Sequence, residues 1–304
     1  MTTLRFGFVT GAAREEVEAL EELPIASLWA GGHVASPHGV PETMIVLARL
    51  AALTRRVRIG TSVLLLPLYP PAIIAKQMAD LDHVTGGRIT MGVGVGGEFE
   101  QEFRACGVPV EERGSRTNES IELLRRLWTG ETISHEGPFY PMKQVRIQPA
   151  PVQVGGPPII VGGRKEPAMA RAAKLGDGWM PYLYSPRAYA SSVQRIREIA
   201  ADVKRDLARF EWMLFVFVTI RDDGERAREE AAAILGGTYN QDFRAFADRV
   251  TIAGTAEQVT ARLQAYVDAG ARHIIFAIAA KEDRFAMMHR LATEIFPKII
   301  VAEG

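Results

Sequence analysis

The fold is decided by the stretch RITMGVGVGG, which runs from Arg88 to Gly97. It begins as a strand-like run and ends in glycines that match G-x-G-x-x-G, the fingerprint of dinucleotide-binding sheets. In those sheets the fingerprint opens the first βαβ unit, and an acid about 20 residues later ends the next strand. Here three strand-helix units precede the stretch, and Glu111 and Glu112 fall between helices. We therefore expect these glycines to let a ligand lie against the backbone after a fourth strand.

Strand-like runs alternate with helix-capable segments on both sides of this stretch. The eight predicted strands are Leu4–Val9, Ile25–Trp29, Val57–Val63, Arg88–Gly92, Pro158–Val161, Gly178–Met180, Trp212–Ile220 and His273–Ile278. The helical segments between them carry apolar residues three and four apart, as in Arg113–Trp128 with Ile121, Leu124 and Trp128 on one stripe. Eight strand-helix units predict a TIM (β/α)8 barrel.

The alternation breaks once, between the fourth and fifth strands. Residues 132–157 contain Gly-Pro-Phe-Tyr and Gln-Pro-Ala-Pro, which indicate turns and loops. We expect this excursion to lie over the mouth of the barrel. Together with the loop after Met180, it would determine which substrate the protein accepts. A domain boundary is the less favoured interpretation, because α/β barrels commonly use about 300 residues as one domain. The prediction is a single domain over residues 1–304.

Composition limits the partners of this chain. Its 36 basic and 36 acidic residues cancel, which argues against nucleic acid as a partner. Cys106 is the only cysteine, so no intrachain disulfide can form, which fits a reducing cytoplasm, and a structural zinc site is not expected. The longest uncharged stretch, residues 59–75, is interrupted by Gly60 and three prolines and is too short to span a membrane. No secretory signal is evident at the N-terminus.

In a TIM barrel the chemistry lies at the carboxyl ends of the strands, and these ends carry mostly glycines, aromatics and hydroxyls. The candidates are His33, Thr61, Ser62, Val63, Gly94, Gly96, Glu98, Gly162, Gly163, Arg164 and Trp179. This inventory suits a flat aromatic cofactor with a phosphate tail better than hydrolysis, which needs a metal cluster, a triad or paired carboxylates. Backbone amides at Gly162 and Gly163 can hold phosphate with help from Arg164. The same glycines could equally form only a tight turn.

Eight motifs, taken in chain order, carry a family resemblance. They are Ile59-Gly-Thr-Ser-Val63, Leu81-Asp-His-Val-Thr-Gly-Gly-Arg88, Met91-Gly-Val-Gly-Val-Gly96, Leu127-Trp-Thr-Gly130, Val161-Gly-Gly163, Gly176-Asp-Gly-Trp179, Gly254-Thr-Ala-Glu-Gln-Val259 and Ala269-Gly-Ala-Arg-His273. Each is weakly specific alone, but the ordered set resembles the bacterial luciferase-like family of flavin- and deazaflavin-dependent oxidoreductases. The resemblance covers essentially the whole chain.

This resemblance implies a barrel that binds FMN or coenzyme F-420 at its carboxyl-terminal mouth and transfers hydride at the ring centre. The cofactor would contact Thr61, Ser62, Val63, Gly94, Gly96, Gly162, Gly163, Arg164 and Trp179. In the F-420 branch a non-prolyl cis peptide buttresses the ring, which places one between Ser62 and Val63. Members often dimerise, so a homodimer acting on a small-molecule substrate is expected.

Two positions depart from the F-420 branch of the family. Where that branch commonly has Asp-His, this chain has Gly32 and His33, so His33 must rely on other partners or on the cofactor. The catalytic glutamate of the sugar-phosphate dehydrogenases is replaced by Gly97, and Glu98 follows one residue later. His33 and Glu98 are the catalytic candidates. Their structural alternatives are a loop-capping histidine and a helix-starting acid.

The resemblance favours F-420-dependent hydride transfer with a small organic substrate. One alternative is an FMN-dependent monooxygenase that receives reduced flavin from a separate reductase. Another, of a different class, is a noncatalytic flavin-binding or carrier protein on the same barrel. The fold alone does not choose among them.

Overall fold

Eight parallel strands close into a barrel in the computed structural model, which describes residues 3–36, 39–239 and 242–301. The pairing order is β12, β1, β2, β3, β5, β8, β9 and β10, and β10 pairs again with β12. The strands are β1 (Arg5–Val9), β2 (Ser27–Ala30), β3 (Arg58–Thr61), β5 (Ile89–Gly94), β8 (Ile159–Gly162), β9 (Gly178–Met180), β10 (Glu211–Ile220) and β12 (His273–Ile278). The TIM-barrel prediction is confirmed, and each predicted strand overlaps one of these.

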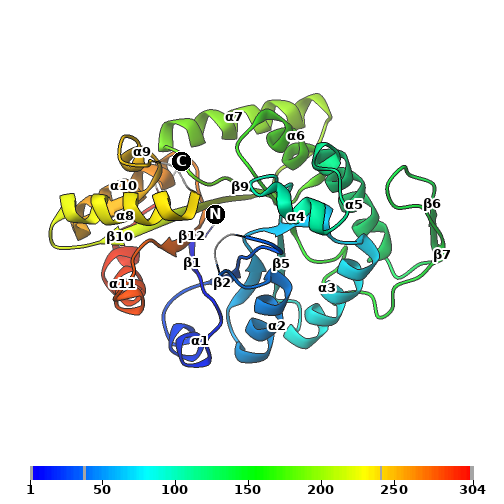
Figure 1. Cartoon of the computed structure of the whole chain (residues 1–304), viewed down its shortest axis with the longest axis horizontal. Helices are drawn as coiled ribbons and strands as arrows, with labels where there is room; N and C mark the ends of the chain where they lie inside the picture. Colours follow the sequence, from blue (N-terminus) through cyan, green and yellow to red (C-terminus); the bar gives the residue numbers. More distant parts are fainter. Residues whose placement is uncertain (1–2, 37–38, 240–241, 302–304) are drawn as a thin grey trace.

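Helices surround the strands as a ring (Figure 1). They are α1 (Arg14–Glu21), α2 (Thr43–Leu53), α3 (Pro71–Thr85), α4 (Glu100–Ala105), α5 (Arg113–Leu127), α6 (Glu166–Leu175), α7 (Pro186–Asp202), α8 (Gly224–Tyr239), α9 (Ala247–Val250), α10 (Ala256–Asp268) and α11 (Arg284–Arg290). Helix α10 begins with a capping box, in which Thr255 and Gln258 satisfy each other's backbone N–H groups. None of the helices in the described part of the chain is both long and apolar enough to cross a membrane.

The inside of the barrel is filled by side chains and is not a channel. Trp29, Ile160, Met180, Met213 and Ile275 form one buried cluster there. Because Trp29 is fully buried and donates its indole N–H to Ser27 Oγ at 2.8 Å, it is a core residue.

A group of ionisable residues closes the amino-terminal end of the barrel, and we call it the floor cluster: Arg5, Arg58, Glu211 and His273. Glu211 accepts from Arg5 at 2.9 Å and from Arg58 at 3.2 Å, while His273 Nε2 lies 2.7 Å from Ser27 Oγ. Burial alone would raise the pKa of Glu211, but the nearby His273 ring, whose Nδ1 lies 3.7 Å from Glu211 Oε2, and the two guanidinium groups lower it to about 2. The pKa of His273 is lowered, mainly because burial disfavours its charged form.

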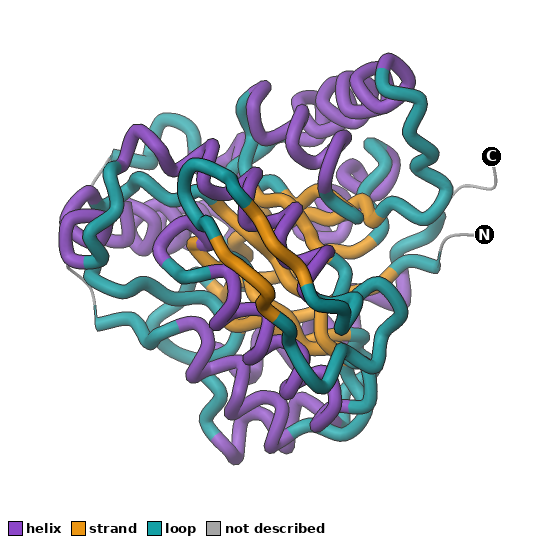
Figure 2. Tube along the Cα trace, turned by 90° about the vertical axis from the view of Figure 1, so that its right-hand side faces the viewer, coloured by secondary structure: helices purple, strands orange, loops and turns teal. Residues whose placement is uncertain are grey.

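The excursion forms an antiparallel hairpin of β6 (Ile133–His135) and β7 (Met142–Val145) outside α5 (Figures 1 and 2). Glu119 of α5 contacts His135 Nε2 at 3.1 Å and accepts from the Tyr140 amide at 2.9 Å. Further on, Gln153 binds Asp82 and the Ile89 carbonyl at the start of β5. The expectation that this segment covers the mouth is therefore wrong. A segment between a barrel helix and the next strand leaves and returns at the amino-terminal face.

Two further short strands add to the predicted pattern. Strand β4 (Leu64–Leu65) pairs with β5, and β11 (Ile252–Gly254) pairs with the far end of β10. Strand β11 lies outside the closed ring of eight, because β10 already contacts β9 and β12 along its first part. These additions lengthen the wall on the mouth side without changing the strand count of the barrel.

Candidate active site at the barrel mouth

The loops after strands β2, β5 and β8 bring His33, Glu98 and Arg164 into one electrostatic neighbourhood at the mouth. Partial burial raises the pKa of Glu98, the charge of Glu102 raises it further, and His33 and Arg164 oppose both. The pKa of Tyr182, after β9, is raised first by burial and then by the charge of Glu98. The two residues proposed from sequence as catalytic, His33 and Glu98, are therefore close enough to interact electrostatically. Arg164, the proposed phosphate-binding residue, also acts on Glu98 through its charge.

His33 has a carboxylate partner that the sequence analysis missed, which is Glu102 of α4. The Nδ1 atom of His33 lies 3.1 Å from Glu102 Oε1 and 3.3 Å from Oε2. Glu102 is fully buried and also accepts from the amides of Val34 at 3.2 Å and Ala35 at 3.5 Å. The edge of the His33 ring meets Phe99, with centroids 5.0 Å apart. The histidine is thus held on two sides.

Steric crowding explains why position 32 carries glycine and not aspartate. A Cβ atom built on Gly32 would lie 2.0 Å from the carbonyl oxygen of Pro41. The same carbonyl accepts the amide of His33 at 3.3 Å, so the backbone approach is part of the loop. An aspartate cannot stand there without moving the loop, and Glu102 supplies the carboxylate from another element instead.

The segment Thr61-Ser62-Val63 joins three strands at the mouth. Thr61 is fully buried and donates to the Gly92 carbonyl at 2.6 Å, so it ties β3 to β5 and does not face a ligand directly. The peptide between Ser62 and Val63 is cis, which confirms that prediction. Ser62 remains partly exposed, and its amide donates to the Ala30 carbonyl at 2.7 Å.

The side chain of Val63 explains two of the predicted cofactor-binding glycines. A Cβ atom on Gly94 would lie 2.6 Å from one Val63 methyl group, and one on Gly162 would lie 3.0 Å from the other. These glycines therefore make room for Val63, where the sequence suggested room for a ligand. Gly96, at φ +65°, lies in the turn before α4 and backs onto the ring of Phe103.

Gly163 and Arg164 form a turn between β8 and α6. Gly163 has φ +117°, a conformation that L side chains rarely adopt. Across residues 3–36, 39–239 and 242–301, no acceptor bonds the amide N–H of Gly163 or Arg164. The Arg164 side chain is exposed, with its guanidinium carbon 5.1 Å from the centre of the Tyr182 ring. Two free donors and one cation at a helix start are the features of a phosphate site.

Trp179 supports the turn between β8 and α6 from the buried core. Its indole N–H donates to the Gly163 carbonyl at 2.8 Å, and the side chain is fully buried against Tyr184 and Tyr189. The expectation that Trp179 touches a cofactor is therefore wrong, because residue type alone does not tell which face of a short strand an aromatic occupies. Its contact supports the proposed phosphate site from the core.

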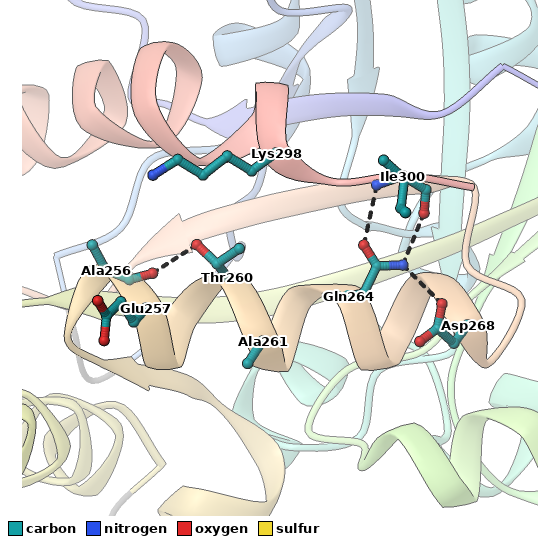
Figure 3. Close-up of a pocket in the computed structure, with 8 residues that line it drawn as sticks. All are labelled: Ala256, Glu257, Thr260, Ala261, Gln264, Asp268, Lys298 and Ile300. Atoms are coloured by element: carbon teal, nitrogen blue, oxygen red, sulfur yellow. Dashed lines mark hydrogen bonds between the residues drawn. The ribbon is translucent and has the colours of Figure 1, made fainter. Parts of the chain in front are cut away.

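A separate groove of about 600 Å³ lies between α10 and the C-terminal segment (Figure 3). Gln264 crosses it and pairs its amide group with both the N–H and the C=O of Ile300. None of the mouth residues lines this groove. In the described part of the chain, no group of three or more His, Cys, Asp and Glu side chains is arranged to hold a metal ion.

Comparison with known proteins gives relatives of two cofactor classes. The chain is 29% identical over 286 residues to the F-420-dependent glucose-6-phosphate dehydrogenase of Rhodococcus erythropolis, covering 84% of this chain and 80% of that protein. It is 31% identical over 222 residues to the FMNH2-dependent dimethylsulfone monooxygenase of Pseudomonas putida, covering 71% and 59%. An uncharacterised Mycobacterium tuberculosis protein is 41% identical over 139 residues, 46% of this chain. The chain thus spans about half (47%) of that relative's length.

The fold and the family agree. An F-420-dependent secondary alcohol dehydrogenase structure superimposes with a TM-score of 0.84 at 18% identity, covering 99% of this chain and all of that one, which supports the barrel alone. The family model described as luciferase-like monooxygenase matches residues 7–273. This match runs from within β1 to the start of β12 and includes all the mouth loops described above, and so the chain belongs to the luciferase-like monooxygenase family.

Proposed function

We propose that this chain is an oxidoreductase that binds F-420 at the barrel mouth and transfers hydride between it and a small organic substrate. The observation that carries the proposal is the His33 imidazole after strand β2, held by Glu102 at 3.1 Å, with Glu98 close enough to feel its charge. Hydride transfer to or from an alcohol moves a proton as well, and the imidazole of His33 is a side chain of the type that serves as a general acid or base.

The residues present fit a flavin-type cofactor with a phosphate tail. The free amides of Gly163 and Arg164 and the Arg164 charge would hold phosphate, while Ser62, Val63 and the backbone at Gly94 and Gly162 would form the wall beside the ring. Thr61 and Trp179 would support these contacts from the core. When bound, the ring supplies an acceptor or donor for a hydride.

The protein's own task is then to manage the proton. When an alcohol carbon is oxidised to a carbonyl, a hydride leaves the carbon and the hydroxyl proton must pass to a base. We assign the base to His33 Nε2, which no group in the described ranges hydrogen-bonds, and reduction of a carbonyl returns that proton. Glu98 would act as a second proton-exchanging group in the same neighbourhood, and partial burial raises its pKa.

Titration of the purified protein with F-420 and with FMN, followed by cofactor fluorescence, tests the proposal. We expect saturable binding of F-420 that is tighter than binding of FMN. Turnover is then measured with a panel of alcohols and carbonyl compounds. Failure to bind either cofactor would refute the proposal, and bound reduced cofactor that no substrate reoxidises would favour a carrier protein.

A second candidate function is supported by the 31% identity to the dimethylsulfone monooxygenase. In this alternative the mouth binds FMN that a separate reductase has reduced, and molecular oxygen is the second substrate. Oxygen consumption coupled to a hydroxylated product would favour it over hydride transfer. Tighter binding of FMN than of F-420 would point the same way.

We further propose a homodimer formed by one barrel domain per chain, in the cytoplasm. Exposed apolar residues on neighbouring helices α2 and α3, namely Ile45, Ile73 and Val84, give a surface that a second copy could cover. The single cysteine, Cys106, supports a reducing compartment. The closed barrel built from residues 5–278 supports one domain.

A further inference from the structure

We propose that Glu102 is a positioning residue that fixes the tautomer of His33, so that Nδ1 carries the proton and Nε2 is left as the base. The inference rests on the proposed function for its catalytic meaning. Its structural content, which nitrogen of His33 is protonated, can be measured without cofactor or substrate.

The contacts around Glu102 set the direction of its hydrogen bond to His33. A carboxylate has acceptors only, so the nitrogen that faces it must be the donor. Glu102 already accepts from the amides of Val34 and Ala35 through Oε2, while Oε1 lies nearest to His33 Nδ1 at 3.1 Å. Three donors therefore converge on one buried carboxylate, and each of them finds an acceptor there. The neutral imidazole is therefore held with its proton on Nδ1.

The same contacts connect two loops of the mouth. Glu102 belongs to α4, which follows strand β5, whereas His33 to Ala35 follow strand β2. Phe103, the next residue of α4, is buried in a cluster with Leu65 and Leu68 and anchors the helix. Because Glu102 is fully buried, it does not touch a substrate in the mouth directly, and its effect on the reaction must act through His33.

Glu102 also has a role when His33 gains a proton. An imidazolium formed during alcohol oxidation would face a negative charge at 3.1 Å, which stabilises it. Glutamine at position 102 keeps the shape and an acceptor for the amides of Val34 and Ala35 but removes the charge. It also offers an N–H group toward Nδ1, which favours the other tautomer.

The test is ¹⁵N NMR of histidine-labelled protein at a pH where the imidazoles are neutral. The His33 signals are assigned by comparison with the His33→Asn variant. We expect the wild type to show Nδ1–H with an unprotonated Nε2, and Glu102→Gln to lose this preference. Glu100→Gln is the matched control, since Glu100 lies on the same helix but is exposed and, among the residues that the structure describes, binds only Arg104. It should leave the His33 signals unchanged.

An Nε2–H tautomer in the wild type, or the same tautomer in Glu102→Gln, would overturn the inference. If Glu102→Gln does not fold, the wild-type spectrum alone decides which nitrogen is protonated. With a substrate in hand, Glu102→Gln should lower kcat by about 10²-fold, with cofactor affinity within a factor of two. Cofactor binding without the predicted tautomer would reject this inference alone, whereas the predicted tautomer without cofactor binding would reject only the proposed function.

Discussion

Replacing Glu211 by glutamine should destabilise the protein in a pH-dependent way. Its pKa lies at about 2 instead of the ordinary 4.5, because His273, Arg5 and Arg58 favour the charged form. At about 1.4 kcal/mol per pH unit, this difference corresponds to about 3 kcal/mol of stability near pH 7. Since the folded-state pKa is the lower one, this contribution is complete above pH 4.5 and is lost as the pH falls through about 2.

The assay is urea unfolding of the wild type and Glu211→Gln, followed by far-UV circular dichroism. We expect the two free energies of unfolding to differ by about 3 kcal/mol at pH 7 and by about half of that at pH 3. Glu18→Gln is the control, because Glu18 pairs with Arg14 at the surface and should change stability by less than about 1 kcal/mol. A difference below about 1 kcal/mol at pH 7, or one that does not change with pH, would refute this account of the floor cluster.

Three further predictions concern the mouth and the surface. Gly163→Val should weaken F-420 binding by about 10- to 100-fold, the equivalent of one charge-assisted hydrogen bond. The control Gly155→Val, at another positive φ but in open space, should not, and equal affinities of Gly163→Val and the wild type in a fluorescence titration would mean that the phosphate binds elsewhere. His33→Ala should lower kcat by about 10²-fold or more and leave the cofactor Kd nearly unchanged, and steady-state kinetics with normal turnover would reduce His33 to a lining residue. Ile45→Glu should convert the dimer to monomer in analytical ultracentrifugation, while Val154→Glu, at a still more exposed position on the excursion, should not; a monomeric wild type would contradict the proposed dimer.

The sequence was sufficient to predict the barrel because each strand is a short apolar run bounded by turn residues. Such runs as Trp212–Ile220 and His273–Ile278 can be recognised without knowing their neighbours. The path of residues 132–157 was not predictable in the same way. Turn-rich composition indicates a loop, but the side of the barrel on which it lies depends on the preceding helix, and Glu119 holds the hairpin along α5.

The candidate site was predicted only as far as single positions allow. His33, Glu98 and Arg164 follow from their places after strands, and the structure brings them together. Glu102 could not be found from a local pattern, because 69 residues separate it from His33. A carboxylate beside Phe103, on the buried side of a short helix, was the one available signal. The floor cluster was not predicted from the sequence for the same reason, since its members come from four different strands.

The contact of Val63 with Gly94 and Gly162 makes three positions depend on one another. One valine side chain fills the space that Cβ atoms at both glycines would need, so alanine at either glycine collides with a methyl group. A smaller residue at position 63 would relieve the collision at position 94 and ease the one at position 162, where the Val93 carbonyl oxygen also lies 3.2 Å from the added Cβ. Substitutions here are therefore expected to be epistatic: an alanine at position 94 should be tolerated better in a background that has already lost the valine, and the order in which such changes arise is constrained.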